Sequence, residues 1–153
     1  MNRNLVCAAA LILLGACGKA SSDAAANGAA DAGEVTLRPG QYAIEFVREA
    51  TVPGQPSDPT HETESQCLSD EEVKHPETLF VPPTDSCRPQ DAKASKGDFE
   101  AHLVCNLPEY SPSDFVFEVH GTYGRDGADL TGEANVEGTT LRETRTFRRQ
   151  GDC

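Results

Sequence analysis

The stretch that decides the fold is FEAHLVCNLPEYSPSDFVFEVHGTY, residues 99–123. Apolar residues at 99, 101, 103 and 105 alternate with more polar neighbours, and the same alternation returns at 115, 117, 119 and 123. A period of two places successive side chains on opposite faces of a β-strand. This stretch therefore predicts two half-buried strands, each with one apolar face, joined by a loop at residues 106–114.

The same period continues on both sides of this stretch. Tyr42, Ile44 and Phe46 alternate towards the N-terminus, residues 130–136 repeat the pattern, and residues 141–149 are rich in Thr and Arg. Turn residues at 39–40, 96–97, 112–114, 125–127 and 137–138 separate the segments. Residues 34–153 are thus predicted to form one mainly β domain, a single antiparallel meander sheet. Gly121 and Gly132 lie inside strand patterns, so we expect the sheet to be curved or partly closed.

One short helix is predicted after residue 68. Ser69 and Glu72 fit a capping box, and Pro76 limits the helix to about two turns. Beyond it, Leu79, Phe80 and Val81 form an apolar triplet between prolines. We expect this triplet to be a lid on one open end of the sheet, and a loop that binds a partner is the alternative.

Residues 1–16 have the order of an export signal. Arg3 precedes an apolar run at residues 5–14, which is too short for a bilayer that needs roughly 20 residues. Gly15 and Ala16 directly before Cys17 resemble the lipobox of bacterial lipoproteins, in which the cysteine is lipidated and the chain is cut just before it. The alternative is an ordinary secretory signal in which Cys17 is incidental.

Residues 17–33 follow as a lipidated cysteine and a tether. The tether has low complexity and no β-branched or aromatic residue, so it cannot bury a hydrophobic face and is expected to be flexible. Gly18, rather than Asp, resembles the lipoproteins that are sorted to the outer membrane of a Gram-negative cell. The expected location is the cell envelope, at the periplasmic face of that membrane.

Four cysteines remain for the domain after Cys7 leaves with the signal and Cys17 takes the lipid: Cys67, Cys87, Cys105 and Cys153. An exported chain meets an oxidising compartment, so an even set predicts two disulfides out of three possible pairings. The turn at residues 96–97 lies midway between positions 87 and 105, so a hairpin there places Cys87 opposite Cys105. Cys67 is then left to pair with Cys153.

The charge of the chain limits its partners. The formal charge is −12 at pH 7, so the protein repels polyanions, and neither nucleic acid nor anionic head groups bound directly are expected partners. The expected partners are the membrane, through the lipid anchor, and an unidentified envelope protein. Acidity of this size is also accounted for by solubility alone.

No motif for catalysis is evident. The sequence has no nucleophile elbow, phosphate loop, dinucleotide fingerprint or zinc-protease helix. We therefore expect neither an enzyme nor a cofactor.

One weak metal candidate comes from pairing two strands so that residue numbers sum to 222. This register places His102 opposite His120, with Glu100 and Glu118 nearby, a set that can hold Zn²⁺ or Cu²⁺. The simpler interpretation is a solvated sheet face.

Basic residues gather in the last strand of this acidic chain: Arg142, Arg145, Arg148 and Arg149. Cross-strand pairing with Glu133, Glu143 or Glu118 accounts for them structurally. A patch that binds a carboxylate or phosphate is the alternative, with Arg145 and Arg149 as candidates.

The order of these features resembles the bacterial envelope family catalogued as domain of unknown function 3617 (DUF3617). The matching stretches are LRPGQY at 37–42, CLS at 67–69, Cys87, Cys105 and RRQGDC at 148–153. Tyr42 stands where the family commonly has Trp. The resemblance implies an exported, often lipid-anchored β domain, and it brings no assigned activity and no catalytic residues.

The function that follows is a non-catalytic binding or structural module held on a membrane by lipid. The alternatives are a periplasmic carrier of a lipophilic small molecule and a hydrolase or metal-dependent enzyme. The apolar side chains are about as many as a small sheet needs to fill its own interior. We therefore expect no internal cavity of the roughly 300 Å³ that a ligand pocket needs. A partner is then expected to bind at Leu79, Phe80 and Val81 or at the arginine-rich last strand.

Overall fold

A computed structural model describes residues 35–153. The predicted signal, the lipidation site at Cys17 and the tether lie outside the described residues. Within the described part, seven strands form one antiparallel sheet in the order β2-β1-β7-β6-β5-β4-β3. The strands are β1 (Gly40–Thr51), β2 (Thr60–Leu68), β3 (Cys87–Ser95), β4 (Asp98–Cys105), β5 (Phe115–Gly124), β6 (Gly127–Val136) and β7 (Thr139–Gly151).

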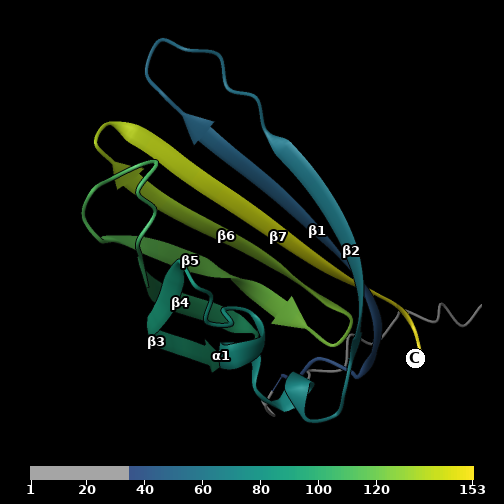
Figure 1. The fold of residues 1–153 in the computed structure, drawn as a ribbon. Coiled ribbons are helices and arrows are strands. Elements are labelled where there is room, and N and C mark those ends of the chain that lie inside the picture. The colour runs from purple at the N-terminus through teal and green to yellow at the C-terminus, as the bar shows by residue number, and fades with distance from the viewer. Residues whose placement is uncertain (1–34) are drawn as a thin grey trace, which may run out of the picture. The chain divides into compact units, whose positions relative to one another are not determined.

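The predicted mainly β fold with an antiparallel meander is confirmed. Strands β3 to β7 pair in sequence order, β7 then pairs with β1, and β1 pairs with β2. The sheet is strongly curved but not closed, because β2 and β3 remain as separate edges (Figure 1). Strand β2 was not predicted because it lacks the alternation of apolar and polar residues, and only Leu68 among its nine residues is buried.

The register between β4 and β5 differs from the predicted one by two residues. Phe99 lies opposite Gly121 and Ala101 opposite Val119, so the paired numbers sum to 220. A shift of two keeps every side chain on its predicted face, because the period of a strand is two. The observed pairing places Phe99 opposite Gly121 instead of opposite Tyr123.

The helical segment is broken into two short pieces. A 3₁₀ turn, η1, spans Glu72–Lys74, and a single α-helical turn, α1, spans Pro76–Leu79. The predicted capping box is present, since the Ser69 N–H donates to Glu72 Oε2 at 2.8 Å and the Glu72 N–H donates to Ser69 Oγ at 3.3 Å. The predicted short helix is confirmed, but as two separate turns, because Pro76 starts the second piece, as a proline at the first helical position can.

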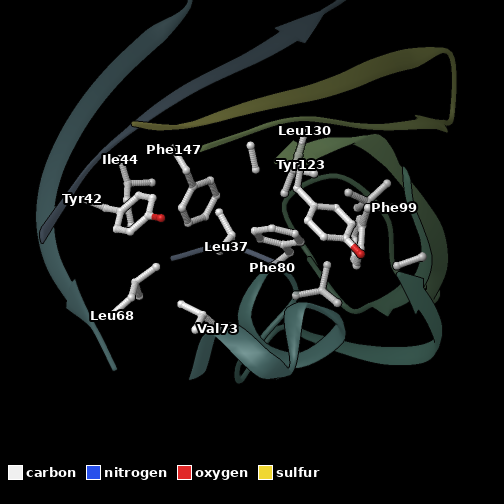
Figure 2. Packing of buried hydrophobic residues seen from close by; sticks show 14 of the residues in the cluster. Leu37, Tyr42, Ile44, Leu68, Val73, Phe80, Phe99, Tyr123, Leu130 and Phe147 are labelled. Carbon is white, nitrogen blue, oxygen red and sulfur yellow. The ribbon is translucent and has the colours of Figure 1, made fainter. Parts of the chain in front are cut away.

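The core lies between the concave face of the sheet and this helical segment. Phe80, which is 0% exposed, sits at its centre, with ring centroids 5.2 Å from Phe99, 5.7 Å from Tyr123 and 5.3 Å from Phe147 (Figure 2). Val81 is equally buried. Phe80 and Val81 thus cover part of the concave face, as the lid interpretation expects. A partner-binding role for this loop stays a prediction, since Leu79 is partly exposed and Val81 lines a groove.

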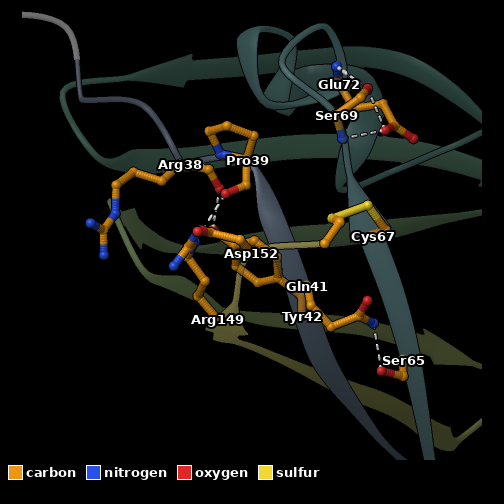
Figure 3. The surroundings of a disulfide bond; sticks show 11 residues. Arg38, Pro39, Gln41, Tyr42, Ser65, Cys67, Ser69, Glu72, Arg149 and Asp152 are labelled. Carbon is orange, nitrogen blue, oxygen red and sulfur yellow. Dashed lines mark hydrogen bonds and ion pairs between the residues drawn. A yellow bond between two sulfur atoms is a disulfide. The ribbon is translucent and has the colours of Figure 1, made fainter.

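Both predicted disulfides are present. Cys87 and Cys105 are direct cross-strand partners of β3 and β4, with Cα atoms 4.1 Å apart. Cys67, on edge strand β2, binds the C-terminal Cys153 at a Cα separation of 5.9 Å. Figure 3 shows this second bond near Arg149, whose Nε donates to the Pro39 carbonyl at 3.0 Å. The C-terminus is thereby joined to both β1 and β2.

The sharp curvature makes Gly121 intolerant of a side chain. A Cβ at this position would lie 2.1 Å from the Asp129 carbonyl oxygen and 2.8 Å from the Leu130 Cα. Because both neighbours are backbone atoms, β5 and β6 would have to separate. We expect Gly121→Ala to lower the free energy of unfolding by about 1–3 kcal/mol, measured by urea denaturation.

Gly124→Ala is the matched control on the same strand. In the described part of the chain, no atom lies within 4 Å of a Cβ built there, so this substitution is expected to change stability by no more than about 0.5 kcal/mol. Equal effects of the two substitutions would contradict the close approach of β5 and β6 at Gly121.

Candidate functional site

The concave face of the sheet is covered over only part of its area. Phe80 packs on residues near the start of β4 and the ends of β5 and β7, and leaves the opposite ends of these strands open. A groove of about 480 Å³ lies there. The groove is open to solvent and exceeds the roughly 300 Å³ at which ligand pockets begin, so it is a surface site that the count of apolar side chains did not predict. The expectation of no internal cavity stays a prediction.

The floor of the groove is apolar. Leu103, Phe117 and Leu141 line it from β4, β5 and β7, and Val81 lines it from the lid. The Phe117 ring lies over Gly132, where a Cβ would come within 2.1 Å of Cε1. Glycine at this position thus leaves room for the Phe117 ring against β6.

One wall of the groove is charged. Arg48 of β1 donates from Nε to Glu143 Oε2 of β7 at 2.6 Å, and Arg145 forms an ion pair with the same carboxylate. Arg145 also donates from Nη1 to the Phe80 carbonyl at 2.7 Å. Both guanidinium groups lie over the Phe46 ring, at 5.3 Å for Arg48 and 5.7 Å for Arg145. These positions face one another because Phe46 pairs with Arg145 and Arg48 pairs with Glu143 in the β1–β7 register.

Glu143 is held in its charged form by this arrangement. Burial acts to raise the pKa of the carboxyl, but the charge of Arg145 and hydrogen bonds from Arg48 and Arg145 together lower the pKa below its ordinary value. The side chain of Glu143 is only 15% exposed. The carboxylate therefore acts as a fixed partner for the two arginines and is not suited to proton transfer near neutral pH.

The rim of the groove comes from two loops. Leu107 and Tyr110 line it from the loop between β4 and β5, and Asp58 lines it from the loop between β1 and β2. Glu49, also at the groove, accepts a hydrogen bond from Ser57 of that second loop. The loops thus set the length of the groove across the sheet.

The arginines of the last strand have separate roles. Arg142 pairs with Glu133 as predicted, Arg148 pairs with Asp129, and Arg149 contacts Pro39 and Asp152. Arg149 thus has structural partners, and its candidacy for binding stays a prediction. Arg142 and Arg145 both line the groove, and Arg145 is the one of these four that pairs with Glu143 in its charged wall.

The histidines do not form the predicted cross-strand pair. His102 lies opposite Glu118 and His120 lies opposite Glu100, because the register is shifted by two residues. His102 Nδ1 lies 2.9 Å from Asp91 Oδ1, and this hydrogen bond raises the pKa of the imidazole. Within residues 35–153, no group of three or more His, Cys, Asp or Glu side chains is placed to hold a metal ion. The predicted β4–β5 register, which placed His102 opposite His120 as a metal candidate, is therefore corrected.

Sequence reasoning missed Phe46 as a support for the site and Arg48 as a member of it. The signal was present in β1, where the alternating face changes from Tyr42 and Ile44 to Arg48 and Ala50. An inner face that becomes charged halfway along a strand indicates that the core ends there. The sequence pattern did not reveal that the inner face of β7 also becomes charged at Glu143 and Arg145, the residues that pair with Arg48 and Phe46.

Together these features define a small disulfide-bonded β-sheet domain with a ligand-sized groove on its concave face. The model of a family described as "Protein of unknown function (DUF3617)" matches residues 37–153, and the chain belongs to this family. No curated protein and no solved structure matches the chain. Among residues 35–153, no helix is long and apolar enough to cross a membrane.

Proposed function

We propose that this protein is a non-catalytic binding module of the bacterial cell envelope that holds its ligand in the concave groove. The observation that carries the proposal is the groove of about 480 Å³ with an apolar floor and one polar wall. Ligand sites in proteins have this character, mostly apolar with a few placed polar groups. The groove also favours the second candidate function, a periplasmic carrier of a lipophilic small molecule.

The chemistry of the lining supports binding over catalysis. Cys87 and Cys105 line the groove, and both are held in their disulfide. A thiol in that state is not available as a nucleophile. Glu143 has a lowered pKa, whereas a general acid needs a raised one.

Two features support a place in the envelope. The residues before Cys17 have the order of a lipoprotein signal, and Gly18 resembles lipoproteins of the outer membrane. The two disulfides of the domain fit an oxidising compartment such as the periplasm. The proposed arrangement is a domain tethered by residues 18–33 to a lipid on Cys17, at the periplasmic face of the outer membrane.

Filling the groove is expected to abolish binding of an apolar probe. Ala50 lines the groove and is exposed, so Ala50→Trp places an indole in it without removing a core contact. In a soluble Cys17→Ser protein, this change is expected to raise the dissociation constant for N-phenyl-1-naphthylamine at least about tenfold. Probe fluorescence, excited outside the tryptophan band, measures it.

Ala43→Trp is the matched control. Residue 43 lies on the same strand but on the opposite face, where it pairs with Ser65 and Arg148. The Ala43→Trp variant is expected to have the same dissociation constant for the probe as the unsubstituted domain. Equal binding by both variants, or no binding by the unsubstituted domain, would overturn the proposed function.

Cys17→Ser is expected to move the protein from the membrane fraction to the soluble fraction. The acyl chains on Cys17 are the proposed anchor, and their loss removes the apolar surface that holds the domain on the bilayer. Cell fractionation with immunodetection measures the distribution. Cys7→Ser, inside the signal, is the control that should remain in the membrane. Retention of the Cys17→Ser protein in the membrane fraction would contradict the lipid anchor.

A further inference from the structure

We propose that the groove binds an amphiphile with one acyl-type chain and an oxyanion head, a carboxylate or a phosphate, and that the head contacts Arg48 and Arg145. This inference rests on the proposed function and names the chemical class of its ligand. It is carried by the hydrogen-bonding state of the two guanidinium groups and by the apolar path that leads away from them.

Both arginines are anchored through the same two nitrogens. Arg48 donates from Nε to Glu143 and from Nη1 to Glu62 Oε2 at 2.7 Å, while Arg145 donates from Nε to Glu143 and from Nη1 to the Phe80 carbonyl. The Nη2 group of each therefore has no hydrogen-bond partner among residues 35–153. Among residues 35–153 that are not exposed, every buried side-chain nitrogen has a hydrogen-bond partner. Nη2 of Arg145 has none, so this atom is not buried and is accessible from solvent.

The hydrogen bonds of Arg48 and Arg145 hold the charged wall ready for a hydrogen-bond acceptor on a ligand. The Phe46 ring and the Glu143 carboxylate hold both guanidinium groups in place, so binding costs little side-chain entropy. The free groups are donors only, because a guanidinium has no acceptor. An oxyanion matches them best, since arginine binds carboxylate and phosphate oxygens through paired N–H donors. A cationic head finds no acceptor on these two guanidinium groups.

The lining of the groove carries as many arginines as carboxylates: Arg48, Arg142 and Arg145 against Glu49, Asp58 and Glu143. The least exposed groups are Glu143 at 15% and Arg145 at 24%, and these two compensate each other. Arg48 adds a second positive charge, which it shares between Glu143 and Glu62. Arg48 at 46% and Glu62 at 63% exposure are both screened by water. Glu49 and Asp58 line the groove on the side of the β1–β2 loop, which directs an anionic head towards Arg145 and away from that loop.

The apolar path suits a chain. It runs from Leu141 on β7 to Phe117 on β5 and Leu103 on β4, and Val81 and Leu107 flank it. Neighbouring strands lie about 4.8 Å apart, so the path from β7 across β6 and β5 to β4 is about 14 Å long. An extended alkyl chain fits a path of this shape, with its head at the charged wall.

The test compares four amphiphiles that share a twelve-carbon chain: dodecanoate, dodecyl phosphate, dodecanol and dodecylammonium. Each displaces the neutral probe from the soluble Cys17→Ser protein below its micelle-forming concentration. The two anions are expected to bind at least about tenfold more tightly than dodecanol, and dodecylammonium more weakly than dodecanol. The ratio of the dissociation constants for dodecanoate and dodecyl phosphate distinguishes a fatty acid from a phospholipid as the source of the head.

Arg48→Gln tests the role of the wall. It is expected to weaken binding of the preferred anion about tenfold and to leave dodecanol unchanged, while Arg48→Lys retains part of the preference. Arg148→Gln, on the opposite face of β7, is the control and should change neither affinity. Thermal unfolding of each variant shows that the domain is folded.

The failure of this inference is distinguishable from failure of the proposed function. Equal affinities for dodecanoate, dodecyl phosphate and dodecanol, with no effect of Arg48→Gln, would overturn the oxyanion head and leave the groove as a binding site. Tighter binding of dodecylammonium than of both anions would overturn it as well. Absence of binding by all four amphiphiles and by the neutral probe would overturn both.

Discussion

Phe80→Ala is expected to lower the free energy of unfolding by about 3–5 kcal/mol, which is a large part of the total for a domain of this size. Phe80 is fully buried and contacts the rings of Phe99, Tyr123 and Phe147, so its loss leaves a cavity bordered by three strands. Those strands are paired into the sheet and cannot move inwards to close the cavity. Urea denaturation followed by circular dichroism measures the change.

Val116→Ala is the matched control for this prediction. Val116 is 47% exposed on the convex face of β5, and its truncation is expected to change stability by no more than about 0.5 kcal/mol. A loss below about 1 kcal/mol for Phe80→Ala would show that the lid does not hold the inner face of the sheet together.

Removal of the Cys67–Cys153 disulfide is the second large effect. Its cysteines are separated by 86 positions, so in the chain-entropy model the bond contributes about 4.5 kcal/mol by restricting the unfolded chain. The double variant Cys67→Ala with Cys153→Ala is expected to lose stability of that order. The end of β7 should also become more open to hydrogen exchange, because this bond joins the C-terminus to edge strand β2.

The other disulfide provides the comparison. Cys87 and Cys105 are separated by 18 positions, and the same model assigns their bond about 3 kcal/mol. The double variant Cys87→Ala with Cys105→Ala is therefore expected to lose less stability than the first. A greater loss from the shorter loop would show that contacts in the folded state, around the buried Cys105, outweigh the restriction of the unfolded chain.

Part of the candidate site was predictable from local sequence. The arginines of β7 were evident as a group, and pairing with acidic neighbours was predicted and is present at Arg142 and Glu133. The groove itself was not predictable, because the number of apolar residues does not reveal where they are covered. Phe80 and Val81 pack on one part of the concave face, and a groove lined by Leu103, Phe117 and Leu141 remains beside them, although Leu103 and Leu141 are themselves nearly buried.

The sequence by itself determined the strands with one apolar face, the curvature expected at Gly121 and Gly132, the lid and the pairing of the four cysteines. These features follow from side-chain period, turn residues and spacing, which act over short distances along the chain. Strand β2 was not predicted because it is exposed on both faces and shows no alternation. The β4–β5 register was not predicted correctly because a shift of two residues leaves the same apolar face inwards. Only the tertiary structure decided that β7 lies beside β1, which brings Arg145 to Phe46 and Glu143 to Arg48. No local pattern encodes that pairing, because it joins strands about a hundred residues apart whose contact depends on closing the whole sheet around Phe80.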